Sequence, residues 1–269
     1  MKTNRFDKYF KANRKLWNAY TPVNERSKTY DLEAFRKGKS SLNSIEIEEL
    51  GEVKGKTLLH LQCHLGQDTL SWARMGAQVT GVDFSEKAVE LAQSLARELS
   101  IDARFIHCNV YDLPEVLEDK FDIVFTSYGA LCWLPDLTQW IRVISHFLND
   151  HGTFYMVEFH PILGMFDDAG RFKYQYFAAS EQIREKVKKG CYSNPEAVFD
   201  TDSYEWTHSL ADTINALLQF GFTIEFVHEF PFCVYGDRPF LKKGKDGLWH
   251  HRNKNIKIPM MFSIKAKKH

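Results

Sequence analysis

Between residues 57 and 157 the sequence alternates short apolar segments with amphipathic ones, and this alternation restricts the fold more than any other feature. Five segments have the length and composition of strands: 57–61, 78–82, 104–108, 121–126 and 153–157. Three connecting segments (66–75, 85–99 and 137–148) carry apolar residues at i+3 and i+4 spacing, which is typical of helices with one buried face. The alternation predicts a mainly parallel sheet covered on both faces, a doubly wound α/β domain.

Boundary residues support these segments. Ser85 stands where a helix N-cap is expected, and Gly76 follows the helix that starts near Gly66. Residues 149–152, Asn-Asp-His-Gly, are expected to end the third helix before a strand begins at Thr153.

The last third of the chain changes character. Residues 162–205 are rich in aromatic side chains without a clean period, which favours an inserted substrate cap over a sheet layer. Ser209 and Asp212 form a capping-box pattern that opens a helix ending at Gly221. No helix is predicted between the last two strands, 222–228 and 260–265, so they should pair antiparallel.

The pattern divides one predicted domain, 1–269, into four parts. Residues 1–50 are expected to form one or two helices over a ligand site, and 51–160 a ligand-binding core. The cap at 162–205 and a C-terminal helix with two strands at 206–269 complete it. The whole sheet is expected to have seven strands.

Composition excludes several classes of protein. Lys plus Arg and Asp plus Glu each number 35, so no net charge favours nucleic acid. No run of about 18 apolar residues and no signal-peptide pattern is present, so we expect a cytoplasmic protein without a membrane partner. The five cysteines include no CxxC pair, which argues against disulfides and a thiolate metal site. The oligomeric state is left open.

The loop after the first strand is the predicted ligand site, because doubly wound sheets bind ligands beyond the carboxyl ends of their strands. It reads Gln62-Cys63-His64-Leu65-Gly66-Gln67-Asp68. Asp83, at the end of the second strand, lies about 20 residues further on, where an acid usually accepts hydrogen bonds from ribose hydroxyls. A nucleoside-bearing ligand is therefore expected.

The same loop distinguishes between nucleoside cofactors. A diphosphate needs several glycines so that backbone amides can approach it, but this loop has only Gly66 and no Lys or Arg. The carboxylate and ammonium of S-adenosylmethionine require less of the loop. This cofactor, with S-adenosylhomocysteine as product, is therefore favoured over a dinucleotide.

Three stretches together resemble class I S-adenosylmethionine-dependent methyltransferases: 57–84, Asn-Val-Tyr-Asp-Leu-Pro at 109–114, and 121–128. The resemblance covers roughly residues 50–160. Within the family, the sequence looks like a small-molecule branch whose first motif reads His-Leu-Gln-Cys-His. It implies a Rossmann-like methyltransferase fold with an antiparallel last strand.

The first motif departs from the usual acid-x-Gly-x-Gly-x-Gly of that family. The four positions hold His60, Gln62, His64 and Gly66, and the adenine-side acid is replaced by Asn109. The side chains of Gln62 and His64 are expected to replace lost contacts with hydrogen bonds. The predicted cofactor-binding residues are Gln62, Cys63, His64, Gly66, Asp68, Asp83, Phe84, Asn109, Val110 and Ser127.

A metal site is not expected. His60 and His64 are four residues apart on an extended segment, which separates them by about 13 Å, too far to share one ion. Structural or cofactor contacts are the preferred interpretation of both.

The acceptor should lie beside the ends of the fourth and fifth strands. His160 and His208 are predicted to orient or deprotonate it, because their ordinary pKa is near the working pH. A structural role is the commoner one for such histidines and stays open for both, and for Trp133 a packing role stays open. The predicted substrate-binding residues are Trp133, Glu158, Tyr204 and Trp206.

The sequence therefore predicts S-adenosylmethionine-dependent methyl transfer to a small molecule. Two alternatives stay open: a non-catalytic module that binds the same cofactor, and a nicotinamide-dependent oxidoreductase. Methylation of RNA or protein is disfavoured by the neutral charge. The acceptor and its methylated atom are not indicated.

Overall fold

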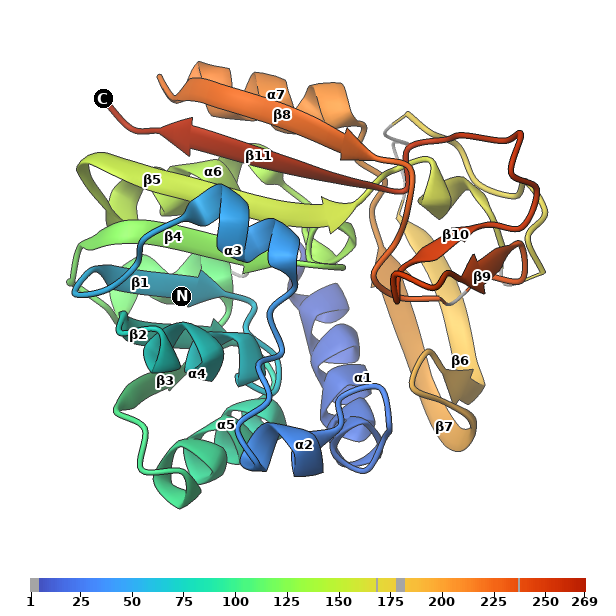
Figure 1. The fold of residues 1–269 in the computed structure, drawn as a ribbon, viewed down its shortest axis with the longest axis horizontal. Coiled ribbons are helices and arrows are strands. Elements are labelled where there is room, and N and C mark those ends of the chain that lie inside the picture. Colours follow the sequence, from blue (N-terminus) through green and yellow to red (C-terminus); the bar gives the residue numbers. More distant parts are fainter. Residues whose placement is uncertain (1–4, 168, 178–181, 237) are drawn as a thin grey trace.

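The computed structural model describes residues 5–167, 169–177, 182–236 and 238–269. Its centre is a seven-stranded sheet with the order β3-β2-β1-β4-β5-β11-β8 (Figure 1). The strands are β1 (Thr57–Leu61), β2 (Gln78–Asp83), β3 (Ala103–His107), β4 (Phe121–Ser127), β5 (Leu148–Phe159), β8 (Thr223–Phe230) and β11 (Met261–Lys267). β1 to β5 are parallel, and β11 is antiparallel to both β5 and β8. The doubly wound fold with an antiparallel last strand is confirmed.

Helices cover both faces of the sheet. They are α1 (Asp7–Glu25), α2 (Leu32–Arg36), α3 (Ser44–Leu50), α4 (Gln67–Arg74), α5 (Glu86–Glu98), α6 (Leu137–Phe147) and α7 (Leu210–Gln219). Short 3-10 turns follow β3, β4 and β5: η1 (Val110–Glu115), η2 (Leu131–Trp133) and η3 (Leu163–Met165). The predicted caps form, since the side chains of Ser85 and Ser209 accept amide hydrogens from Ala88 and Asp212.

The alternation of side chains along the strands explains the two cores. Leu59, Val124 and Met156 pack with α6 and α7 on one face. Leu58 and Ile123, one residue earlier in their strands, pack on the other face with side chains of α3 and α4. A parallel sheet buried on both faces in this way requires the continuous apolar strands seen in the sequence.

The boundary predicted at residues 149–152 is wrong, because β5 begins at Leu148 directly after α6. Leu148 pairs with Phe121, and the register to β4 then shifts before Thr153. The His151 amide donates to the Lys268 carbonyl at 3.1 Å. Hydrogen bonds from a distant segment therefore extend the strand through residues that locally favour a turn.

The segment 162–205 is not a layer of the main sheet, as expected, but the sequence did not indicate the hairpin it contains. Strands β6 (Ile183–Cys191) and β7 (Asn194–Glu205) form a separate antiparallel ribbon (Figure 1). Ion pairs support its register, with Lys186 2.8 Å from Asp200 and Lys189 2.8 Å from Glu196. Because charged residues occupy many positions of both strands, the sequence shows no clear apolar alternation there.

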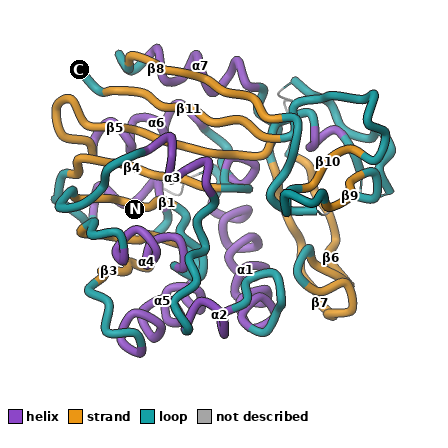
Figure 2. The backbone as a smooth tube through the Cα atoms, in the orientation of Figure 1, coloured by secondary structure: helices purple, strands orange, loops and turns teal. Residues whose placement is uncertain are grey.

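Two further elements gather at the carboxyl ends of the parallel strands. The arrowheads of β1, β4 and β5 point toward α1 and the β6–β7 hairpin (Figure 1). α1 packs against β7 and α5. A short hairpin, β9 (Leu241–Lys243) and β10 (Trp249–His251), stands beside β6 and β7 in the region predicted to be loop (Figure 2). Among the described helices, none combines the length and apolar character needed to cross a membrane.

Candidate functional site

The loop between β1 and α4 keeps a glycine-type backbone without the glycines. Gln62, His64 and Gly66 have φ of 58°, 49° and 76°, all in the left-handed region. For Gln62 and His64, such a conformation costs of order 1–3 kcal/mol each. The alternating conformation falls on the three positions where the resembling family usually has glycine. The backbone path of the motif is therefore retained although its residues have changed.

Gly66 is the one residue of this loop that packing also restricts. A Cβ atom placed on it would lie 2.7 Å from the Ala92 Cβ and 2.8 Å from the Phe105 ring. The Gly66 amide donates to the Cys63 carbonyl at 2.9 Å. The glycine thus allows the start of α4 to approach α5 and β3 closely.

Asp83 lies at the end of β2 and is fixed by the same loop. Its carboxylate accepts the His64 amide at 2.9 Å and the Ser85 amide at 2.8 Å. Burial raises the pKa of Asp83 to about 6, while these amides act in the opposite direction. Each oxygen retains a lone pair for another donor, as binding of ribose hydroxyls requires.

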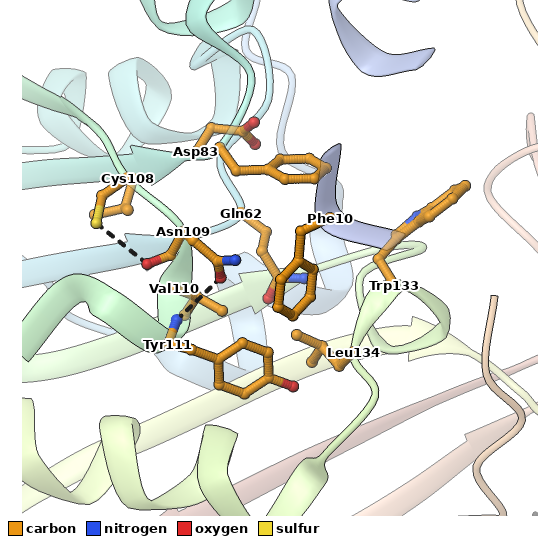
Figure 3. A pocket seen from close by; sticks show the side chains of 11 residues that line it. Phe10, Gln62, Asp83, Cys108, Asn109, Val110, Tyr111, Trp133 and Leu134 are labelled. Carbon is orange, nitrogen blue, oxygen red and sulfur yellow. Dashed lines mark hydrogen bonds between the residues drawn. The ribbon is translucent and has the colours of Figure 1, made fainter. Parts of the chain in front are cut away.

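A pocket opens beside Asp83 between the ends of β1, β2 and β3 (Figure 3). Phe10 of α1 and Trp133 of η2 close its outer side. The residues that line it are Phe10, Gln62, Val82, Asp83, Phe84, Cys108, Asn109, Val110, Tyr111, Trp133 and Leu134. It thus has a carboxylate at one end and apolar and aromatic walls, a combination suited to a nucleoside.

The polar groups of the pocket fit S-adenosylmethionine. Gln62 Nε2 donates to the Ala130 carbonyl at 3.0 Å, but its buried Oε1 has no hydrogen-bond partner within the described residues. Asn109 Oδ1 accepts the Tyr111 amide at 3.2 Å, which directs the Asn109 side chain along the pocket (Figure 3). A ligand that donates to Gln62 would remove the cost of that unpaired acceptor.

His60 occupies the position of the family's usual acid and is neutral. Burial lowers its pKa to about 3. Its Nδ1 lies 2.8 Å from the Thr69 hydroxyl and its Nε2 lies 3.5 Å from Ser127 Oγ. Ser127 donates to Asp68 Oδ2 at 3.0 Å. The carboxylate of this region is therefore on the first turn of α4 instead of on β1.

His64 is also neutral, because burial lowers its pKa to about 3. Its Nε2 lies 3.2 Å from Asn24 Nδ2, and its ring packs against Trp17 and Tyr30 at centroid distances of 5.0 and 5.1 Å. His64 and His60 thus have separate partners. Among the described residues, no group of three or more potential ligands could hold a metal ion.

The structure brings most of the predicted cofactor residues to one place. Gln62, Asp83, Phe84, Asn109 and Val110 line the pocket. Four others lie in or beside the β1–α4 loop: Cys63, His64, Gly66 and Asp68. Burial raises the pKa of the Cys63 thiol well above its usual range, so this thiol is a packing group.

The two predicted catalytic histidines have other partners. His160 is buried, and its Nε2 lies 2.9 Å from Glu229 of β8. His208 Nε2 lies 2.6 Å from the Leu134 carbonyl. Neither ring lines the pocket of Figure 3. Their part in proton transfer stays a prediction, which loss of turnover with unchanged cofactor affinity in alanine variants would support.

The predicted substrate residues divide into three kinds. Trp133 lines the pocket. Tyr204 and Trp206 pack on α1, each against the Tyr9 ring, at 4.8 and 5.7 Å. Glu158 accepts the amides of three consecutive residues, 129–131, and thereby shapes the loop after β4.

Several pocket residues were not among the predicted site residues: Phe10, Val82, Cys108, Tyr111 and Leu134. Val82 and Cys108 stand at strand ends next to predicted site residues, so their position was a usable signal. Phe10 belongs to the segment 1–50 that was expected to lie over the ligand site, whereas Leu134 reaches the pocket through tertiary packing that no local pattern indicated.

The sheet order β3-β2-β1-β4-β5-β11-β8 with an antiparallel β11, together with an acid at the tip of β2, is that of the Rossmann-like methyltransferase fold. Residues 58–152 match a family model described as a methyltransferase domain. Over this stretch, about a third of its length, the chain is similar to class I S-adenosylmethionine-dependent methyltransferases.

Similar proteins agree with this assignment. A ubiquinone biosynthesis O-methyltransferase from Alkalilimnicola ehrlichii is 29% identical over 103 residues, 38% of this chain and 41% of that protein. The chain spans about half the length of the first curated relatives it matches. An S-adenosylmethionine-dependent methyltransferase from Mesorhizobium loti superposes with a TM-score of 0.56 at 20% identity, covering 87% of this chain and all of that one. A DhpI–SAH complex gives 0.58 at 12% identity, with 97% of each chain covered.

Proposed function

We propose that the protein transfers the methyl group of S-adenosylmethionine to a small-molecule acceptor. The observation that carries this proposal is the β1–α4 loop, which keeps the left-handed backbone at Gln62, His64 and Gly66 and directs the His64 amide to Asp83. A loop conserved in shape at a cost in backbone strain indicates a binding role.

The residues of the pocket have separate tasks in this proposal. Asp83 accepts the ribose hydroxyls, Asn109 and Val110 contact the adenine, and Gln62 Oε1 faces the amino-acid part. When bound, the cofactor supplies a sulfonium methyl that is already activated toward nucleophiles. Phe10 and Trp133 exclude water from the site and thereby favour a reactive arrangement.

A small acceptor is supported by two observations. The net charge of zero gives no attraction to nucleic acid. The curated relatives are named for O-methylation in ubiquinone biosynthesis. The described cysteines are free, which agrees with a reducing compartment such as the cytoplasm.

We further propose that the four parts, 1–50, 51–160, 162–205 and 206–269, work as one domain.

Calorimetry with S-adenosylmethionine and S-adenosylhomocysteine tests the proposal. We expect saturable binding of both, and an increase in melting temperature with each. NADH serves as the control, because the rival oxidoreductase would bind it. Binding of NADH with no response to either sulfur compound would refute the proposal, whereas cofactor binding without turnover on any acceptor would favour the non-catalytic module.

Replacing Asp83 by alanine should weaken cofactor binding about tenfold or more. Two ribose hydroxyls would lose a charged acceptor, and such bonds contribute about 1.5–3 kcal/mol. Titration of the variant with S-adenosylhomocysteine measures the loss. Unchanged affinity in a folded variant would place the ribose elsewhere.

Cofactor affinity should fall as the pH decreases below about 6. The pKa of Asp83 is raised to about 6 in the unliganded protein, and ribose hydroxyls donate to the ionised form. Ligand binding therefore favours loss of the proton, so affinity is complete above this pKa and decreases below it. Titrations from pH 5 to 8 measure this slope. Asp83→Asn should be weaker at all pH values and should lose the slope.

A further inference from the structure

Four tyrosine side chains from four separate segments meet beside the β1–α4 loop. Tyr30 lies between α1 and α2, Tyr128 follows β4, Tyr192 is in the β6–β7 turn, and Tyr235 lies between β8 and β9. We refer to these four residues as the tyrosine cluster. The resemblance to known methyltransferases assigned no role to any of them.

The four residues contact one another in two pairs. The hydroxyls of Tyr30 and Tyr192 are 2.6 Å apart, and their rings are 6.3 Å apart between centroids. The rings of Tyr128 and Tyr235 meet edge to face at 5.7 Å. The first turn of α4 connects the pairs, because Gln67 Nε2 donates to the Tyr30 carbonyl at 2.9 Å while its neighbour Asp68 accepts the hydroxyl of Ser127, the residue before Tyr128. The two pairs therefore belong to one cluster.

The cluster adjoins the place where a methyl group would be transferred. The Tyr30 ring lies 5.1 Å from the His64 ring of the cofactor loop. Tyr128 directly follows Ser127 at the carboxyl end of β4, next to the switch point of the sheet. Ligands of doubly wound sheets extend outward from this point.

Two carboxyl groups lie beside the cluster. Glu46 is fully buried in α3 and accepts the Tyr128 hydroxyl at 2.8 Å. Asp68 accepts the Ser127 hydroxyl at 3.0 Å. Burial raises the pKa of the Tyr235 hydroxyl, and the nearby Asp68 and Glu46 act in the same direction. Burial also raises the pKa of Glu46 to about 7.

Two of the four tyrosine side chains remain exposed, unlike core tyrosines. Tyr192 is 47% exposed and Tyr235 is 36% exposed, whereas Tyr155 of β5 is completely buried. Exposed aromatic rings next to a carboxylate attract a cation, because the negative face of each ring and the charge of the carboxylate both attract positive charge.

We propose that the tyrosine cluster, with Asp68 beside it, binds the cationic group of the methyl acceptor, and that the acceptor is therefore a small molecule with an ammonium or alkylammonium group. The inference rests on the proposed function and specifies its substrate class. An anionic acid would be repelled by the carboxylate of Asp68, and a neutral molecule of the same shape would lack the attraction between opposite charges.

A pair of probes that differ only in charge tests the proposal. Choline carries a quaternary ammonium, and 3,3-dimethylbutan-1-ol has the same shape without the charge. Calorimetry on the protein saturated with S-adenosylhomocysteine should show choline binding at least about tenfold more tightly, at constant ionic strength. Equal affinities, or no binding of choline, would overturn the inference.

Variants of single residues identify where choline binds. Tyr235→Leu removes a ring and should weaken choline binding about tenfold, whereas Tyr235→Phe keeps the ring and should retain most of it. Asp68→Asn should weaken choline without affecting the neutral probe. Tyr174→Leu is the matched control, because Tyr174 bonds to Glu185 outside the cluster. Loss of choline binding in the control equal to that in Tyr235→Leu would contradict the assignment.

S-adenosylhomocysteine affinity, measured on each variant, separates the two proposals. Normal affinity shows that the variant is folded, and Tyr30→Leu offers a second ring deletion where Tyr235→Leu does not fold. If the wild-type protein binds S-adenosylhomocysteine but not choline, the substrate class is wrong and the proposed function stands. If it does not bind S-adenosylhomocysteine, the proposed function itself fails.

Discussion

Gly66→Ala should lower the free energy of unfolding by about 2–5 kcal/mol. Its left-handed φ of 76° costs an alanine about 1–2 kcal/mol. The new methyl group would also lie 2.7 Å from Ala92 and 2.8 Å from Phe105, and overpacking of this kind costs about 1–3 kcal/mol more. Thermal and urea denaturation followed by circular dichroism measure the loss.

Gly221→Ala is the matched control. Gly221 has a φ of 75°, but a Cβ atom on it would meet no atom within 4 Å. Only the conformational cost of about 1–2 kcal/mol should appear there. Equal losses in the two variants would mean that α4 can move away from α5, and that close packing does not restrict Gly66.

Glu158→Ala should destabilise the protein by about 3–5 kcal/mol and weaken cofactor binding as well. Glu158 is buried and accepts the amide of Gly129, that of Ala130 at 2.7 Å and that of Leu131 at 3.0 Å. Each buried donor left without a partner costs about 1–3 kcal/mol. The loop also positions Gln62, whose amide donates to the Ala130 carbonyl, so the pocket should lose its shape.

Comparing the stability losses of two Glu158 variants shows whether the lost hydrogen-bond acceptor causes the destabilisation. Glu158→Gln keeps one acceptor oxygen and should be less destabilising than Glu158→Ala. Glu225→Ala, which removes a partly exposed carboxylate from β8, should change stability by about 1 kcal/mol or less. Denaturation and calorimetry with S-adenosylhomocysteine provide both readouts. Cofactor affinity that stays normal in Glu158→Ala would show that the loop forms without this carboxylate.

The sheet could be predicted because its signals are local. Each parallel strand is a short apolar run, and caps such as Ser85 and Ser209 mark where helices begin. The start of β5 could not be predicted, since residues 149–152 favour a turn until Lys268 supplies hydrogen bonds. The β6–β7 hairpin was missed because the buried face of β7 includes the polar residues Thr201 and Ser203 beside Phe199, so it gives no clear apolar alternation in the sequence.

The candidate site likewise has parts that could be predicted from the sequence and parts that could not. Asp83 and the β1–α4 loop were predictable from spacing, because the turn from strand to helix places them together. The tyrosine cluster was not predictable, since Tyr30 and Tyr192 are far apart in the sequence and meet only through folding. The functions of His160 and His208 were inferred from position along strands and helices, which does not fix where a side chain points.

Strand β11 lies between β5 and β8, although it follows both in the sequence. During folding, β8 therefore cannot complete its pairing with the sheet until β11 has inserted and joined both neighbours. Until then the edge of β5 has unpaired backbone groups, which are prone to associate with other chains. Such long-range pairing is slow to form. Recovery of soluble protein should therefore depend on concentration and temperature during refolding, because aggregation competes with the insertion of this one strand.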